Sequence, residues 1–145
     1  MNRQRGFSLL ELMLVVAIVA FSMVLVLPGY QRTIIKSHRT IGKAVLLELV
    51  SRQEQFFMSH KRYSDSLGEL GLGQQYLIDG TASAVAADKA VYRIELALSE
   101  GQYTGVRAVP LNGQLRDVEC GTLGLSQRGE RSASGHQFQQ PERCW

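Results

Sequence analysis

The chain has 145 residues with a formal net charge of +3, and 45% of its residues are hydrophobic. This length leaves room for one domain of ordinary size beside a membrane segment. Arg3 and Arg5 stand before the first apolar run, and the rest of the chain carries 14 Lys and Arg against 13 Asp and Glu. Because the chain without these two arginines is nearly neutral, its net positive charge is weak evidence for a nucleic-acid partner.

Residues 7–27 form an apolar run of 21 residues that contains one charged side chain, Glu11. As an α-helix rising ~1.5 Å per residue, the run spans about 31 Å, which matches a hydrocarbon core of about 30 Å. A secretory signal has a shorter apolar core followed by a small-residue cleavage site, whereas here the small residue, Gly6, comes first. The run therefore predicts a membrane-spanning helix that stays on the protein after processing.

Glu11 is unfavourable inside such a helix, because an ionised side chain at the centre of a membrane helix costs about 2.5–3.5 kcal/mol. The cost falls near the helix start, where the helix dipole favours negative charge. Two interpretations follow from the residue alone. The carboxylate extends back to the lipid headgroups, or a partner supplies a positive charge.

The stretch from Gly6 to Glu11 (GFSLLE), behind a short basic leader, resembles the prepilin processing site of type IV pilins and type II secretion pseudopilins. The resemblance implies that residues 1–6 are a leader peptide. It also implies that a prepilin peptidase cleaves between Gly6 and Phe7 and that Phe7 is then N-methylated. Glu11, five positions into the mature chain, would act in assembly together with Phe7, and Pro28 falls where the family usually carries a proline.

The same resemblance implies a place in the cell and a set of partners. Residues 7–29 would anchor the protein in the inner membrane of a Gram-negative bacterium as a single-pass protein, with residues 30–145 in the periplasm. The subunit would then enter an extracellular pilus. The implied partners are other pilins, major and minor, in a helical filament, the prepilin peptidase and N-methyltransferase, the inner-membrane assembly platform and the lipid bilayer.

Between residues 30 and 58 the apolar residues recur at helical spacing, which predicts an amphipathic helix with one face on a core. The stripe consists of Ile34, Ile41, Val45, Leu49 and Phe56. Joined to the apolar run, this segment makes one long helix from Phe7 to Met58. Pro28 should kink or loosen that helix because it lacks a backbone donor.

Residues 59–90 are rich in turn formers and predict an irregular loop. Within it, the run from Arg62 to Gly71 resembles the Tyr-x-x-x-Leu-x-x-Leu-Gly pattern that often follows the long helix in pilins. Its members Tyr63, Leu67 and Leu70 can hold the loop against the helix. The alanine-rich residues 81–89 fit either a short helix or an exposed loop.

Alternating apolar residues between positions 91 and 125 predict an antiparallel sheet. Residues 91–98 and 103–109 form the expected hairpin, and residues 118–125 supply one or two further short strands. A long N-terminal helix packed on a small antiparallel sheet is an α+β fold. The pilin resemblance implies the same arrangement.

Cys120 and Cys144 are the two cysteines of the chain. In an exported domain such a pair most simply forms a disulfide, which would bound a tail of residues 120–144. The alternative is a metal site that also uses His136, but the spacing fits no zinc pattern. A tail of this kind is most similar to the minor pilins of type IVa pili, whereas type II pseudopilins typically lack it.

These observations predict a minor type IV pilin, a structural subunit that enters pili or primes their assembly for motility or adhesion. The sequence contains no Ser/His/Asp set, no metal-spaced histidines and no glycine loop for phosphate, so neither an enzyme nor a cofactor is expected. A type II secretion pseudopilin is one alternative. Another is a pilus receptor for extracellular DNA that uses Arg128, Arg131 and Arg143, although Glu130 and Glu142 interleave with these arginines.

Overall fold

The structure, a computed structural model, describes residues 8–145, and in residues 24–28 it describes the backbone alone. The chain forms two compact units, residues 1–34 and residues 35–145. The predicted cleavage site between Gly6 and Phe7 lies outside the described residues, as does the side chain of Pro28.

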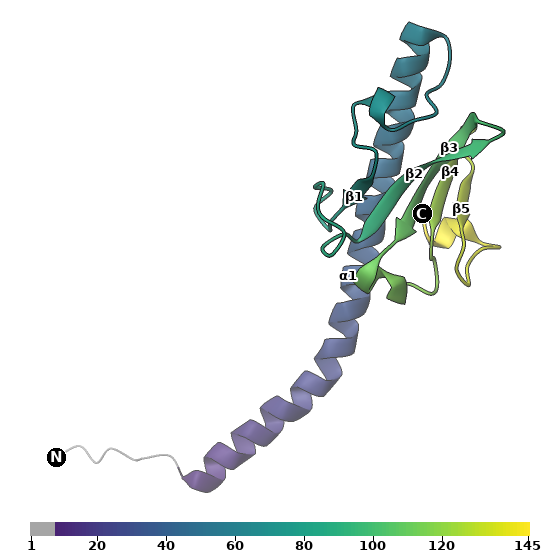
Figure 1. Ribbon diagram of the computed structural model, residues 1–145. Helices are drawn as coiled ribbons and strands as arrows, with labels where there is room; N and C mark the ends of the chain where they lie inside the picture. The colour runs from purple at the N-terminus through teal and green to yellow at the C-terminus, as the bar shows by residue number, and fades with distance from the viewer. Residues whose placement is uncertain (1–7) are drawn as a thin grey trace. The chain divides into compact units, whose positions relative to one another are not determined.

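The described part of the first unit is the beginning of helix α1 (Leu9–His60), which has 52 residues in all (Figure 1). The helix continues without interruption through Pro28 and Gly29, and it confirms the long N-terminal helix predicted from the sequence. Across the described residues, no helical stretch is both long enough and apolar enough to cross a membrane. Of the predicted anchor, residues 7–29, the structure leaves out Phe7 and the side chains of residues 24–28.

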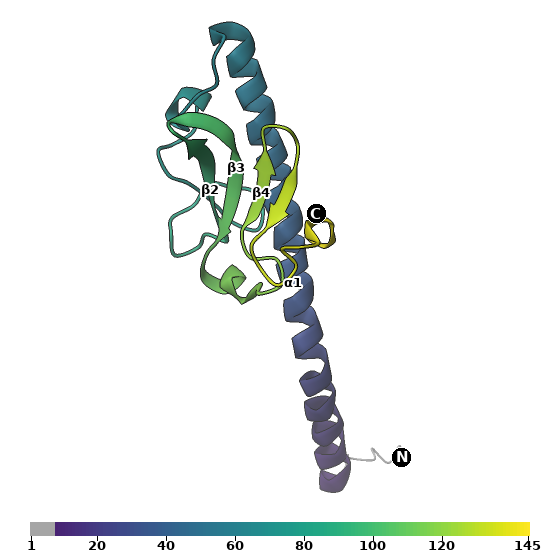
Figure 2. The same ribbon diagram turned by 90° about the vertical axis from the view of Figure 1, so that its right-hand side faces the viewer.

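The second unit joins the rest of α1 to a five-stranded antiparallel sheet with the strand order β1-β2-β3-β4-β5. Figures 1 and 2 show that the helix runs along one face of this sheet. The strands are β1 (Tyr76–Ile78), β2 (Tyr92–Ser99), β3 (Gln102–Pro110), β4 (Leu123–Ser126) and β5 (Arg131–Ala133). The predicted α+β fold is therefore confirmed.

The core lies between the helix and the sheet, because alternate residues of each central strand point to the helix side. Strand pairing places Ile94 opposite Ala108 and Val106 opposite Leu125, and all four are buried. From the helix, the buried side chains are those of Val45, Leu46 and Leu49. Helix and sheet approach closely at Gly42, where an added Cβ would lie 3.1 Å from the Tyr92 ring.

The loop that follows α1 is held on the helix by polar as well as apolar contacts. Leu70 is buried, and Tyr63 and Leu67 pack against the core, as their spacing predicts. Gln53, which lies in the helix stripe that faces the core, is completely buried. Its amide nitrogen donates to the Ser64 carbonyl and its amide oxygen accepts from the Ser64 N–H, both at 2.9 Å. A polar residue is stable there because both of its polar atoms are satisfied.

The sheet differs from the prediction at both edges. Strands β1 and β5 were not expected, because three-residue strands are too short to show alternation. The predicted strand region 118–125 is a strand only from Leu123, since Asn112–Arg116 forms a short 3₁₀ helix and turns follow it. The alanine-rich stretch is a turn region rather than a helix, with a single β-bridge between Ile78 and Ala84.

The predicted disulfide between Cys120 and Cys144 is present, with a Cα–Cα distance of 5.7 Å. Both cysteines are buried in the core. This finding excludes the alternative in which the two thiols bind a metal, because a disulfide sulfur is no thiolate ligand.

Candidate functional site

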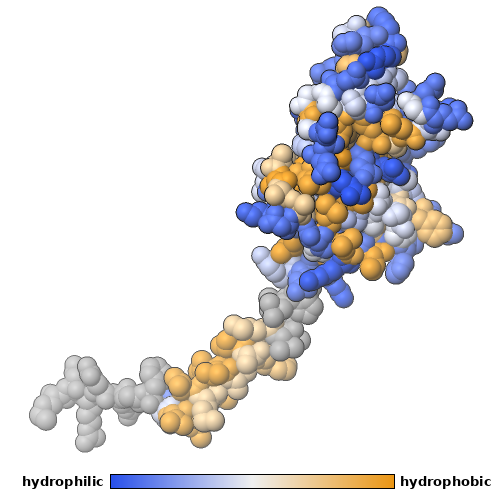
Figure 3. Space-filling view, in the orientation of Figure 1, coloured by the Kyte–Doolittle hydropathy of each residue, from blue (hydrophilic) through white to orange (hydrophobic). Residues whose placement is uncertain are grey.

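The first unit presents an apolar helix whose side chains are exposed on every face. Each large apolar residue described between Leu9 and Met23 exposes 47–77% of its surface. Figure 3 shows this part of the helix as a hydrophobic rod. A helix that is apolar all round is stable only when other apolar groups cover it, either lipid or neighbouring helices.

Glu11 is the acidic residue in the first turn of this helix. It carries the only charge between Leu9 and Tyr30. The helix dipole favours a carboxylate at that end, so the local backbone supports its position. Gly6 and Phe7 lie outside the described residues. Cleavage between them, methylation of Phe7 and its pairing with Glu11 therefore remain predictions.

A second candidate site is a basic and aromatic cluster of Lys43, Arg131 and Trp145 on the second unit. The Arg131 guanidinium lies over the Trp145 ring, 5.7 Å from its centroid. Trp145 Nε1 donates a 3.0 Å hydrogen bond to the Ser132 carbonyl, which fixes the indole beside β5. The neighbouring disulfide at Cys144 holds the last residue in place.

Lys43 of helix α1 lies within reach of the Arg131 charge. Burial lowers the pKa of the Lys43 ammonium, and the positive charges of Arg39 and Arg131 lower it further. Strand pairing sets Arg131 opposite Leu125, whose buried side chain faces the helix. Arg131 therefore projects from β5 to the helix side of the sheet, where its guanidinium lies over the Trp145 ring.

The structure places the three arginines predicted to contact DNA on neighbouring segments of the C-terminal part. Arg131 of β5 lies over the Trp145 ring. Arg128 lies in the turn between β4 and β5, where it lines a hollow with Thr104 and Glu130. Arg143 is exposed in the short 3₁₀ helix Pro141–Arg143, which contacts β5. Contact of these arginines with DNA stays a prediction, and the sequence prediction did not include Lys43, which is far away in the chain.

A buried polar network fixes the region after β3 to helix α1, and sequence reasoning missed it. Arg39 donates to both carboxylate oxygens of Asp117, and the Asp117 side chain is fully buried. Gln114 donates to the Tyr92 hydroxyl at 2.9 Å and interacts with His38 Nδ1 at 3.0 Å. The hydrogen bond to Asp117 is the main cause that raises the pKa of Arg39. These contacts are structural, since burial leaves no room for a ligand.

Two family models match the chain. Residues 1–27 match the family model of the prokaryotic N-terminal methylation motif. Residues 28–124, more than half of the chain, match the model described as type IV minor pilin ComP, DNA uptake sequence receptor.

A curated relative is the type IV major pilin protein PilA of Myxococcus xanthus (strain DK1622). It is 36% identical over 73 residues, which cover 50% of this chain and 33% of the relative. The match thus spans about a third of that relative's length. Together with the long helix, the antiparallel sheet and the C-terminal disulfide, the model matches lead to one conclusion: the chain belongs to the type IV minor pilin family.

Proposed function

We propose that this protein is a minor structural subunit of a type IV pilus, made as a membrane-anchored precursor and then inserted into the filament. The observation that carries the proposal is the helix from Leu9 to Met23, which is apolar and exposed on all faces and holds one carboxylate. Such a surface needs a bilayer before assembly and a bundle of similar helices after it.

In this mechanism Arg3 and Arg5 keep the leader in the cytoplasm, and the prepilin peptidase cleaves after Gly6. The new amine of Phe7 is methylated and keeps its positive charge. On assembly the helix leaves lipid for a helical bundle, where the Glu11 carboxylate pairs with the Phe7 amine of a neighbouring subunit. A charge pair in an apolar bundle fixes the register of the helices as well as balancing the charge.

The proposal assigns the subunit to the inner membrane of a Gram-negative bacterium, with the domain of residues 30–145 in the periplasm until assembly. Its partners are then other pilins, the prepilin peptidase and the assembly platform. Pro28, in the middle of α1, gives the helix a point at which it can adjust to its neighbours, because proline removes one backbone hydrogen bond.

The test compares Glu11→Gln with Ser22→Ala in cells that make pili. Gln keeps the shape of the side chain and removes its charge. The Ser22 hydroxyl only donates a 2.8 Å hydrogen bond to the Ile18 carbonyl of its own helix. Ser22→Ala is therefore a neutral control in the same helix. We expect Glu11→Gln to be cleaved normally and to stay in the membrane fraction, while the control appears in sheared pili. Equal amounts of the two variants in sheared pili would remove Glu11 from the mechanism.

A second candidate function is a pilus receptor for extracellular DNA. Two observations favour it: the description of the matching family model, and the Arg131 guanidinium over the Trp145 ring, with the charge of Lys43 within reach of Arg131. Clustered positive charge provides phosphate contacts, and an aromatic ring can stack on a base or a sugar. The proposed DNA surface contains these three residues, and Arg128 and Arg143 are further candidates for contact with DNA.

This candidate is tested by fluorescence anisotropy of a labelled duplex with the full-length protein in detergent micelles. Arg131→Ala and Lys43→Ala should each weaken binding and reduce the slope of log K against log salt by about 1. Arg116→Ala removes the same charge from an exposed site on another segment and is the matched control. Absence of binding at low salt, or equal losses in all three variants, would end the receptor proposal without affecting the structural role.

A further inference from the structure

Strand β2 has an edge that is only partly covered. Strand β1 pairs with β2 from Tyr92 to Ile94, and β2 continues to Ser99. Within residues 8–145, no strand pairs with Glu95–Ser99 on the β1 side. An open strand edge presents unpaired backbone groups and is a template for another strand.

The direction of the backbone groups follows from two hydrogen bonds on the β3 side of β2. Leu111 N–H donates to the Val91 carbonyl, and the Thr104 hydroxyl donates to the Ala97 carbonyl. In an antiparallel pair successive residues alternate between the two sides, so the odd-numbered residues of β2 up to Ala97 face β3, and the register shifts between Ala97 and Leu98. Leu96 therefore directs its N–H and carbonyl to the open edge.

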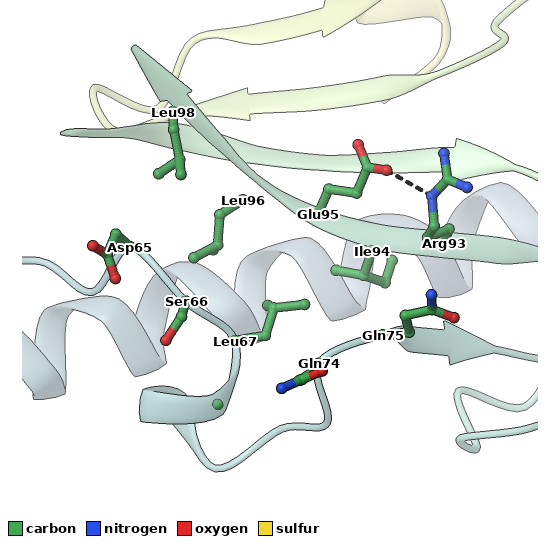
Figure 4. Close-up of a pocket in the computed structure, with 11 residues that line it drawn as sticks. Asp65, Ser66, Leu67, Gln74, Gln75, Arg93, Ile94, Glu95, Leu96 and Leu98 are labelled. Carbon is green, nitrogen blue, oxygen red and sulfur yellow. Dashed lines mark hydrogen bonds and ion pairs between the residues drawn. The ribbon is translucent and has the colours of Figure 1, made fainter. Parts of the chain in front are cut away.

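A hollow of about 780 Å³ lies along this edge, between β2 and the loop segments 65–68 and 74–75. Figure 4 shows Leu67, Leu96 and Leu98 around it, with Asp65 and Ser66 on the loop side. Leu98 exposes 45% of its surface. The hollow thus combines edge backbone groups with aliphatic walls, which suits an extended peptide with aliphatic side chains at alternate positions.

The charges at the hollow determine which peptide fits best. Glu95 is already balanced, since Arg93 Nε lies 2.6 Å and Arg107 Nη2 lies 3.8 Å from its carboxylate. The carboxylate of Asp65 is exposed on the loop rim. The nearby cation Arg62 is already held by Glu69, with Nη2 2.6 Å from its carboxylate. A lysine or arginine at the corresponding end of the peptide would complement it.

At β5, on the other side of the sheet, Trp145 donates its indole N–H to the Ser132 carbonyl, which occupies an acceptor that another strand would need. On the outer side of β1, Val85 N–H donates to the Leu77 carbonyl. Among the described strands, the part of β2 after Ile94 combines an unpaired edge with a hollow that can receive side chains.

We propose that the open edge of β2 binds an extended segment of a partner polypeptide, with a basic residue at Asp65 and aliphatic residues over Leu96 and Leu98. The segment adds as a strand beside β2. This site belongs wholly to the second unit and does not depend on the proposed assembly role of Glu11 or on DNA binding.

The test uses the full-length protein in detergent micelles and the fluorescein-labelled peptide KVTVTV, measured by fluorescence anisotropy. Two further peptides carry N-methyl groups on alternate amides, one set on each edge of the extended peptide. If the peptide binds as a strand that is hydrogen-bonded along one edge, N-methylation of that edge abolishes binding. N-methylation of the other edge leaves binding unchanged. We expect this one-sided loss. Equal binding of both methylated peptides, or no saturation at about 1 mM peptide, would overturn the proposal.

Two protein variants check the side-chain contacts. Leu98→Lys places a charge in the hollow and should weaken binding at least about tenfold, whereas Leu115→Lys changes an equally apolar, 63% exposed residue elsewhere and should not. Asp65→Asn should weaken KVTVTV but leave QVTVTV unchanged. Since Leu98, Leu115 and Asp65 are all exposed, the variants should fold, and circular dichroism verifies this. A loss that is the same in Leu98→Lys and Leu115→Lys would contradict the assignment.

Discussion

Arg39 and Asp117, 78 residues apart in the chain, form a two-pronged ion pair between helix α1 and the turn after β3. The Asp117 side chain is fully buried and that of Arg39 is 11% exposed. Asp117 Oδ1 also accepts a 3.2 Å hydrogen bond from the Cys120 N–H. The pair therefore links the helix to the segment that leads into the disulfide.

Asp117→Asn should destabilise the protein by about 3 kcal/mol, because it leaves the partly buried Arg39 without its counter-charge. The measurement is urea unfolding of the full-length protein in detergent micelles. The control is Glu48→Gln, which removes an exposed i,i+4 pair with Arg52 and should cost less than about 1 kcal/mol. Similar losses of unfolding free energy in the two variants would show that burial does not determine how much the Arg39–Asp117 ion pair stabilises the protein.

Tyr103→Phe should stabilise the protein. The Tyr103 hydroxyl is buried, and among the described residues it has no hydrogen-bond partner. Removing an unsatisfied buried hydroxyl should raise the free energy of unfolding by about 1 kcal/mol. Tyr63→Phe is the control, since the Tyr63 hydroxyl donates to Glu54 at 3.1 Å and is exposed. A loss of stability in Tyr103→Phe would mean that the hydroxyl has a partner in solution.

Stability should fall at alkaline pH. Burial, followed by the charge of Glu54, raises the pKa of Tyr103 to about 12 from its ordinary value of 10.0. Between those values the folded state keeps a proton that the unfolded state has lost, so the free energy of unfolding decreases as the pH rises. The contribution of Tyr103 to the free energy of unfolding is complete below pH 10 and is lost as the pH approaches 12. Denaturant titrations across this range should show a shallower fall for Tyr103→Phe than for the unchanged protein.

Part of the fall in the free energy of unfolding at alkaline pH should remain in Tyr103→Phe. We assign this part to Tyr92, because burial also raises the pKa of that residue. Identical slopes in Tyr103→Phe and the unchanged protein would contradict the assignment to Tyr103.

Removal of the disulfide should loosen the C-terminal tail and lower stability. The bond closes a loop with a sequence separation of 24, and the chain-entropy relation gives about 3–3.5 kcal/mol for such a loop. Trp145 is the only tryptophan of the chain, so its fluorescence reports on the tail directly. In Cys120→Ser/Cys144→Ser we expect a lower Tm and stronger quenching of Trp145 by iodide. Reductant should reproduce both effects in the unchanged protein and change nothing in the double variant.

The elements predicted well are those with a long repeating pattern. The stripe of Val45 and Leu49 and the alternation from Tyr92 to Leu98 each extend over enough residues to identify helix and strand without tertiary information. The disulfide was predictable because the chain holds one cysteine pair. The N-terminal methylation motif was recognisable from a short contiguous stretch, which the family model of residues 1–27 matches, while cleavage after Gly6 and methylation of Phe7 stay predictions.

The elements that were missed depend on contacts between distant segments. Strands β1 and β5 have three residues each. They form because the longer strands β2 and β4 offer backbone groups for pairing. Asp117 lies in a polar turn region and is buried only because Arg39 comes from the helix to meet it. Arg131 lies over Trp145 because the end of the chain packs beside β5, which no local pattern indicates.

The central claim, that the chain is a prepilin whose helix is matured for assembly, is tested most directly by mass spectrometry of the protein extracted from membranes of cells with an active prepilin peptidase. The account predicts a mature chain that lacks residues 1–6 and begins with N-methylated Phe7. A chain that retains Met1 and an unmodified terminus in those cells would contradict it.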